Sequence, residues 1–430
     1  MKKVLMAATA LAVSGGAFAA APAAADDHAG EGFQLKIGGF YNALAIVRDQ
    51  DDPVSPSGGS GTGTDPYTFS GNGKGNIQNF DFNQRGRYII EGSQTLDNGL
   101  TLGFQTQHEI QSSMDTDSAY VYASGGFGRI HFGTDRSAMY KMYEWSPTAG
   151  WGIDYTGHDD SFAHLNGMGH PTAAPFIANQ EMMLTYLTPR FSGLQAGLSF
   201  APAADGLGGK ADPWDAGSNN RFVTDTSSLD NSEYRKVIEA GLNYSQSFDG
   251  FDIGWSGGFG TGRLAGEVSS TEDRRRYLYS TGLNVGFGGF DIGATYKFDT
   301  HGSTNSLTGN FTGSTIGGGD TLTVNGSTFT LPNFGMKNQH FVNAGITYTT
   351  GPWTVGPSFG WEKETAGLER ETMLFDFGAR YALAPGADLV GSIQYVDYDE
   401  GNLDDYVGND TAEDFGGDGV AGLFGIQLNF

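Results

Sequence analysis

The sequence contains no cysteine, and charged residues make up only 17% of its 430 positions. Without cysteine the chain has no disulfide framework and no metal site with cysteine ligands. Basic residues are the scarcer charge, because 24 Lys and Arg stand against 49 Asp and Glu and give a formal net charge of -25. This charge disfavours nucleic acid as a partner, since little is available to neutralise a run of phosphates.

Long hydrophobic runs are also missing. No segment beyond the N-terminal region approaches 18 uninterrupted apolar residues, so no transmembrane helix is predicted. Residues 1–25 have the features of an export signal, with a basic start, a short apolar core and small residues at the end. Cleavage after Ala19 or after Ala25 fits this pattern. We favour the second site, because Asp26 and Asp27 then begin the mature chain.

Glycine and aromatic residues are abundant. Glycine occupies 68 positions and aromatics make up 13%, which argues against simple disorder. From Phe33 onward, apolar residues alternate with small or polar residues, as the two faces of a β-strand require. A soluble sandwich would show the same alternation. A polar face rich in Gly, Ser, Thr and Asn, together with aromatics near the strand ends, favours a transmembrane barrel with a watery interior.

The alternation predicts sixteen strands. They cover residues 33–48, 77–92, 100–111, 117–124, 127–133, 181–187, 194–201, 233–246, 251–261, 275–287, 290–299, 338–349, 353–363, 371–383, 387–398 and 417–430. Short turns such as Gly288-Gly289 alternate with longer polar links, which is typical of an antiparallel barrel of the outer membrane. The predicted fold class is therefore all-β. Because proline cannot donate to a strand ladder, Pro357 predicts a bulge in its strand.

Three parts of the chain resemble Gram-negative general porins, most of all those of alphaproteobacteria. They are the segments 119–133 and 186–197 and the terminal Phe430. In that family the first segment is the hairpin that leads into a long third loop, and the second follows that loop. The resemblance covers nearly all of residues 26–430 as one porin domain. It implies a homotrimer of 16-stranded barrels, each narrowed by a constriction loop that corresponds here to segment 134–180.

The resemblance also implies a function and a set of partners. The expected function is a water-filled outer-membrane channel for passive diffusion of small hydrophilic solutes and ions, without a cofactor. The expected partners are membrane lipid, lipopolysaccharide and, through Phe430, the barrel-assembly machinery. Three alternatives remain: a substrate-specific channel with a saturable site, an outer-membrane hydrolase and an adhesin. Histidines and glycine-rich segments show no ligand or phosphate-loop pattern, so we predict no enzymatic activity.

Charged residues of the predicted loop and barrel wall are candidates for selectivity. Porins of this kind set an acidic loop against arginines on the wall, and rings of charge bias ion passage. The pore-constriction candidates are Arg85 and Arg87 on the wall and Glu144, Asp154, Asp159 and Asp160 in the loop. Alternation also turns Lys36, Arg129, Arg235, Arg276 and Arg380 toward the lumen. The alternative is that these cations only pair with carboxylates of the lumen.

Acidic clusters also occur in predicted external loops. They comprise Asp49, Asp51 and Asp52 in the first loop and Asp397, Asp399 and Glu400 near the end of the chain. Oxygen-rich loops suit Ca²⁺, which takes six to eight oxygen ligands, and such ions bridge loops to lipopolysaccharide phosphates. The alternative is a solvated acidic rim, and no regular twelve-residue calcium loop is present.

Overall fold

The computed structural model describes most of the chain after the predicted export signal. The described residues are 32–50, 56–57, 67–69, 79–110, 116–152, 174–204, 234–264, 275–300, 306–307, 316–317, 321–324, 327–330, 338–365, 369–399, 401 and 417–430. Residues 1–25 lie outside these ranges, so the export signal stays a prediction.

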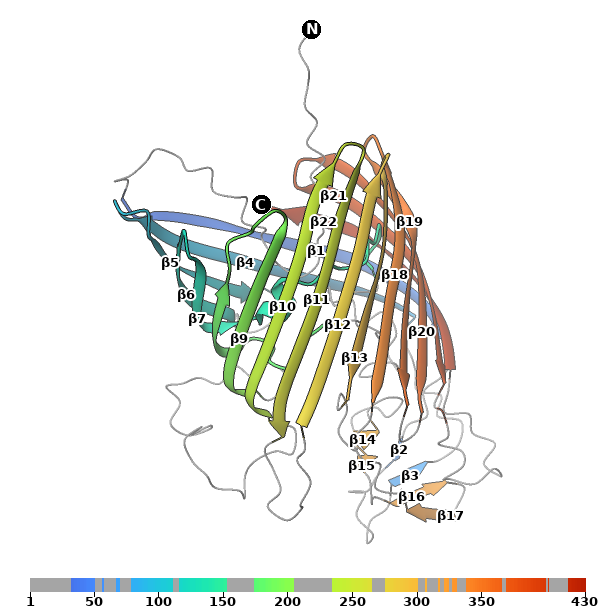
Figure 1. Cartoon of the computed structure of the whole chain (residues 1–430). Helices are drawn as coiled ribbons and strands as arrows, with labels where there is room; N and C mark the ends of the chain where they lie inside the picture. The colour runs from blue at the N-terminus through green and yellow to red at the C-terminus, as the bar shows by residue number, and fades with distance from the viewer. Residues whose placement is uncertain are drawn as a thin grey trace.

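Sixteen strands form one closed antiparallel barrel (Figure 1). In chain order they are β1 (Gln34–Gln50), β4 (Phe80–Thr95), β5 (Thr101–Glu109), β6 (Thr116–Gly125), β7 (Gly128–Asp135), β8 (Glu181–Leu187), β9 (Leu194–Ala204), β10 (Tyr234–Phe248), β11 (Phe251–Leu264), β12 (Arg275–Phe287), β13 (Phe290–Asp299), β18 (Gln339–Thr350), β19 (Trp353–Glu364), β20 (Glu371–Ala384), β21 (Ala387–Asp399) and β22 (Gly417–Asn429). Every predicted strand is confirmed within a few residues.

The barrel closes where the two ends of the chain meet. Strand β1 pairs with β22, and Gly39 exchanges two backbone hydrogen bonds with Phe430, at 2.8 and 3.0 Å. We call this junction of β1 and β22 the seam. An even number of strands returns the C-terminus to the end of the barrel at which β1 begins. Because β1 pairs with β22, the ring is closed and has no open strand edge.

The two faces of the barrel wall have opposite character. Large apolar side chains point outward, and Phe82, Ile393 and Phe424 are 73%, 64% and 62% exposed. Polar groups such as Glu239 and Gln394 are buried on the inner side. A soluble sandwich would hide its apolar face, whereas this wall presents it to the surroundings, as lipid requires.

The connections differ at the two ends of the barrel. At one end, short turns join neighbouring strands, and Gly288 and Gly289 both adopt positive φ, as a tight two-residue hairpin turn demands. Beyond the other end lie two small sheets (Figure 1), made of β2 (Pro56–Ser57), β3 (Tyr67–Phe69), β16 (Thr321–Val324) and β17 (Ser327–Thr330), and of β14 (Ser306–Leu307) and β15 (Ile316–Gly317). These six short strands were not predicted.

Pro357 does not create the predicted bulge. The register between β18 and β19 is the same before and after this residue, and the prediction was wrong. The ladder is instead interrupted at Gly356 and Pro357, where β18 has no paired partner, while pairing with β20 continues. The strand thus accommodates the missing N–H by omitting ladder bonds on one side.

Helix is nearly absent from the described residues. The one helix among them is α1 (Ala138–Lys141), which is capped by the side chain of Ser137. No helix of the described chain has the length and apolar character needed to cross a membrane.

Candidate functional site

The connection between β7 and β8 lies inside the barrel. We call its described parts, residues 136–152 and 174–180, the inward loop. Three serines of the wall accept hydrogen bonds from its backbone. The N–H of Ala138 donates to Ser199 of β9 at 2.7 Å, that of Glu144 to Ser256 of β11 at 2.9 Å, and that of Trp151 to Ser392 of β21 at 2.8 Å. The loop therefore follows the inner wall from β9 to β21.

Amide side chains of the wall bind the loop carbonyl groups. Asn284 donates to the carbonyl oxygen of Trp145 at 2.6 Å, and Gln394 donates to that of Gly152 at 3.1 Å. Serine hydroxyls thus satisfy loop N–H groups while amides satisfy loop C=O groups. Polar backbone inside a barrel needs such partners, because an unpaired buried group costs about 1–3 kcal/mol.

The returning part of the loop is held by charged groups. Glu239 of β10 is buried, and its two carboxylate oxygens accept the N–H groups of Ile177 and Ala178 at 2.8 and 3.1 Å. Lys297 of β13 donates to the carbonyl oxygen of Ala174 at 3.3 Å. The loop is therefore fixed to the wall on both its outward and its return paths.

Glycines of the wall make room for the loop. A Cβ atom at Gly241 would lie 2.7 Å from the carbonyl oxygen of Ala138, and one at Gly345 or Gly378 would collide with the backbone of the loop. Only glycine permits so close an approach of two backbones. Part of the glycine excess of the sequence thus serves the path of the loop.

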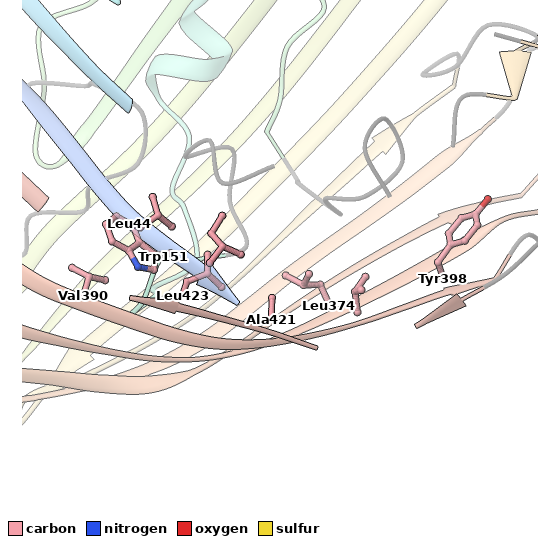
Figure 2. Close-up of a cluster of buried hydrophobic side chains, with 9 residues drawn as sticks. Leu44, Trp151, Leu374, Val390, Tyr398, Ala421 and Leu423 are labelled. Carbon is pink, nitrogen blue, oxygen red and sulfur yellow. The ribbon is translucent and has the colours of Figure 1, made fainter. Parts of the chain in front are cut away.

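An apolar socket receives Trp151 (Figure 2). The socket is one end of an apolar cluster of inner-face residues from four strands around the seam, whose other end is at Tyr398 (Figure 2). The cluster comprises Leu44 and Ile46 of β1, Leu374 of β20, Val390, Val396 and Tyr398 of β21, and Ala421 and Leu423 of β22. Figure 2 shows the indole of Trp151 beside Leu44, Leu423 and Val390. Trp151 is itself buried, so it anchors the far end of residues 136–152 by apolar packing.

The predicted wall arginines lie on the inner face of β4. Arg87 is buried and pairs with Glu109 of β5 and Asp117 of β6, both at 2.9 Å. Arg85 keeps 18% of its side chain exposed and lies 3.6 Å from Glu109. Both arginines therefore face the lumen. Arg87 is paired with carboxylates of the lumen, as the alternative interpretation of these cations predicted. Their role in a constriction stays a prediction.

Glu144 lies on the other side of the lumen. Its carboxylate accepts a hydrogen bond from Asn243 of β10 at 2.7 Å, and its backbone lies against Gly282 of β12. In the ring of sixteen strands β12 is eight places from β4, so Glu144 sits on the wall opposite Arg85. Burial raises the pKa of Glu144, and the hydrogen bond from Asn243 offsets part of this effect. The candidates Asp154, Asp159 and Asp160 lie outside the described residues.

An aromatic group on the inner wall was missed by the sequence analysis. Tyr120 and Tyr122 of β6 and His131 of β7 face the lumen, and the rings of Tyr120 and His131 stack at 4.6 Å. The guanidinium of Arg129 lies 3.8 Å above the ring of Tyr122. Alternation in the sequence could have revealed this group. Val121 lies between the two tyrosines and points outward, so both tyrosines must point inward.

The predicted calcium ligands can be located only in part. Asp49, Asp397 and Asp399 lie at or near the loop ends of β1 and β21, whereas Asp51, Asp52 and Glu400 fall outside the described residues. Among the residues that the structure describes, no group of three or more carboxylates or histidines is arranged to hold a metal ion. Calcium binding stays a prediction.

Comparisons with known proteins agree with this architecture. The model of the Gram-negative porin family matches residues 7–401. No curated protein sequence matches the chain at a significant level. Among solved structures, a porin refined at 1.8 Å is 16% identical with a TM-score of 0.50, covering 92% of this chain and 100% of its own. A trimer form of OmpT, an outer membrane protein of Vibrio cholerae, is 12% identical with a TM-score of 0.51, covering 93% and 100%.

The low identities mean that these solved structures establish the fold, while the family match establishes the relationship. Together with the closed sixteen-stranded barrel and its apolar outer wall, they place the protein in the bacterial outer membrane as a channel. The chain therefore belongs to the Gram-negative porin family.

Proposed function

We propose that the protein is a passive diffusion channel whose lumen is narrowed by the inward loop. The observation that carries this proposal is the path of the loop, which is bound to inner-face groups of β9, β11 and β21. Lys141 and Gln180 of the loop also contact Asp135 of β7 and Asp117 of β6, so passage remains beside the wall formed by β4 and β5. Small hydrophilic solutes and ions then cross according to size, without an energy source.

Opposed charges in the lumen set the selectivity. Glu144 lies on the wall opposite the one that carries Arg85, so solutes pass through a transverse field between them. The formal charge of -25 favours cations in general. Screening over about 8–10 Å makes the nearest charges decisive. Asp154, Asp159 and Asp160 belong to the same proposal, since they follow Glu144 along the loop.

The remaining features of the proposal concern partners. A homotrimer is supported by the trimer form of the structurally similar Vibrio cholerae protein. Lipid and lipopolysaccharide surround the outer wall, Phe430 is read by the barrel-assembly machinery, and Ca²⁺ binds near Asp49 or Asp397. The channel performs no catalysis and takes no cofactor.

Current recordings test the central claim. The purified protein is inserted into planar bilayers under a tenfold KCl gradient. Stepwise conductance in groups of three supports a trimeric channel, and the sign of the reversal potential gives the preferred ion. Folded, heat-modifiable protein that produces no channels would contradict the proposal.

A second function, a substrate-specific channel, is favoured by the half-buried Arg129, whose guanidinium lies on the ring of the buried Tyr122 on the inner wall. A cation held in a fixed place on the wall offers a site to which a solute can bind, which a simple sieve does not need. Solute flux that saturates at low concentration would distinguish this function from free diffusion, where flux rises in proportion to concentration.

A further inference from the structure

Lumen-facing arginines of this barrel are mostly neutralised by carboxylates. Arg87 pairs with Glu109 and Asp117, Arg276 with Asp299, Arg370 with Glu364, and Arg380 with Asp388. Arg129 differs from them. Within the described part of the chain its guanidinium has no carboxylate partner and lies instead on an aromatic ring. Its positive charge is therefore available to a ligand.

The aromatic ring holds this guanidinium in a fixed place. The guanidinium carbon of Arg129 lies 3.8 Å from the centre of the Tyr122 ring, a distance typical of a close cation–π contact. The hydroxyl of Tyr122 donates to Glu91 of β4 at 2.6 Å, which fixes the ring in turn. Arg129 thus loses little conformational entropy when a ligand binds, because its long side chain is already ordered.

The position of Arg129 suits contact with passing solutes. It is the second residue of β7, directly after the short turn at 126–127, and it is half-buried on the inner face. It lies on the wall from β4 to β7, away from the strands that hold the loop at Ser256 and Ser392. A solute that has passed the loop would meet it at the short-turn end of the lumen.

We propose that Arg129, stacked on Tyr122, is a binding station for oxyanionic solutes, meaning small molecules that carry a carboxylate or a phosphate group. The planar guanidinium offers parallel N–H donors that match both groups. In a protein with a formal charge of -25, such a station supplies the local attraction that an anion otherwise lacks. The inference rests on the proposed channel function and deepens it by naming a solute class.

Block of the KCl current tests the station. Potassium benzoate and, separately, potassium phosphate are added to wild-type channels in planar bilayers, and the concentration that halves the current is measured. Arg129→Gln should raise this concentration about tenfold, as expected for losing hydrogen bonds to a charged group. Arg129→Lys, which keeps the charge but loses the planar fork, should give an intermediate value. Stronger block by benzoate identifies carboxylates as the preferred group, and stronger block by phosphate identifies phosphates.

Arg380→Gln is the matched control. Arg380 also faces the lumen near a short turn, and its removal changes the net charge equally, but it is paired with Asp388 at 3.5 Å. The anion concentration that halves the KCl current of Arg380→Gln channels should stay within about twofold of the wild-type value, because a neutralised charge attracts a ligand weakly. Equal effects of the two Gln variants, or wild-type channels that neither anion blocks, would overturn the inference. Failure to form any KCl channel would instead contradict the proposed function itself.

Discussion

Glu239 offers the sharpest test of how the inward loop is held. Its buried carboxylate accepts the N–H groups of Ile177 and Ala178. Hydrogen bonds to charged groups contribute about 1.5–3 kcal/mol each, so Glu239→Ala should weaken the attachment of this segment by about 3–6 kcal/mol. At about 1.4 kcal/mol per factor of ten, the two amides should exchange hydrogen roughly two to four orders of magnitude faster.

Hydrogen exchange followed by mass spectrometry, on folded protein in detergent, measures this effect in a peptide covering residues 174–180. Glu239→Gln keeps one accepting oxygen and should show about half the change in free energy. Asp388→Ala serves as the control, because that carboxylate pairs with Arg380 and not with the loop. Wild-type exchange at Ile177 and Ala178 in the Glu239→Ala variant would refute the assignment of Glu239 as an anchor.

Three further predictions concern the outward path of the loop. Trp151→Ala should remove about 3–5 kcal/mol of packing in the socket and lower the unfolding temperature measured by circular dichroism. Gly345→Val should push the carbonyl of Pro147 away from the wall and change single-channel conductance, whereas Gly391→Ala, where a Cβ has ordinary contacts, should not. Because burial raises the pKa of Glu144, its charge should be lost on acidification before that of ordinary glutamates, so reversal potentials should show a step that Glu144→Gln abolishes. The uncharged carboxyl is the form that burial favours, so ionisation of Glu144 weakens the docking of the loop. This weakening develops as the pH rises from about 4.3, the pKa of glutamate in an unfolded chain, through the raised pKa of the folded protein. Fluorescence of the loop tryptophans should report it.

The strands could be predicted because each one carries its own signal. Alternation with a period of two, bounded by turn residues such as Gly288 and Gly289, depends only on neighbours in the sequence. The predicted limits of β8, β12 and β13 agree with the structure residue for residue. The direction of Arg85 and Arg87 followed from the same alternation.

Other features depend on residues far apart in the sequence. Asp117 is an extra residue in β6, because Gln107 pairs with Ser118 while His108 pairs with Thr116. This bulge turns Asp117 toward Arg87, which simple alternation would not indicate. The parallel pairing of β3 with β16 joins the connection between β1 and β4 to the connection between β13 and β18, which are far apart in the sequence.

The anchors of the loop were also beyond a reading by periodicity. Ser199, Ser256 and Ser392 fit the general expectation of a polar lumen face, and nothing local distinguishes them from other inward serines. Their partners lie 61, 112 and 241 positions away along the chain. Which hydroxyl meets which N–H is decided only when the loop has its path through the closed barrel.

The socket of Trp151 has a consequence for the order of assembly. The residues beside Trp151 are Leu44 of β1, at one end of the chain, and Val390 of β21 and Leu423 of β22, at the other end, so the socket is complete only after the seam has closed. The loop can be inside the barrel before that moment, or it can enter later through the open end at which it is attached. In either order Trp151 is buried in the complete socket only when the barrel is closed, so its fluorescence can report that closure.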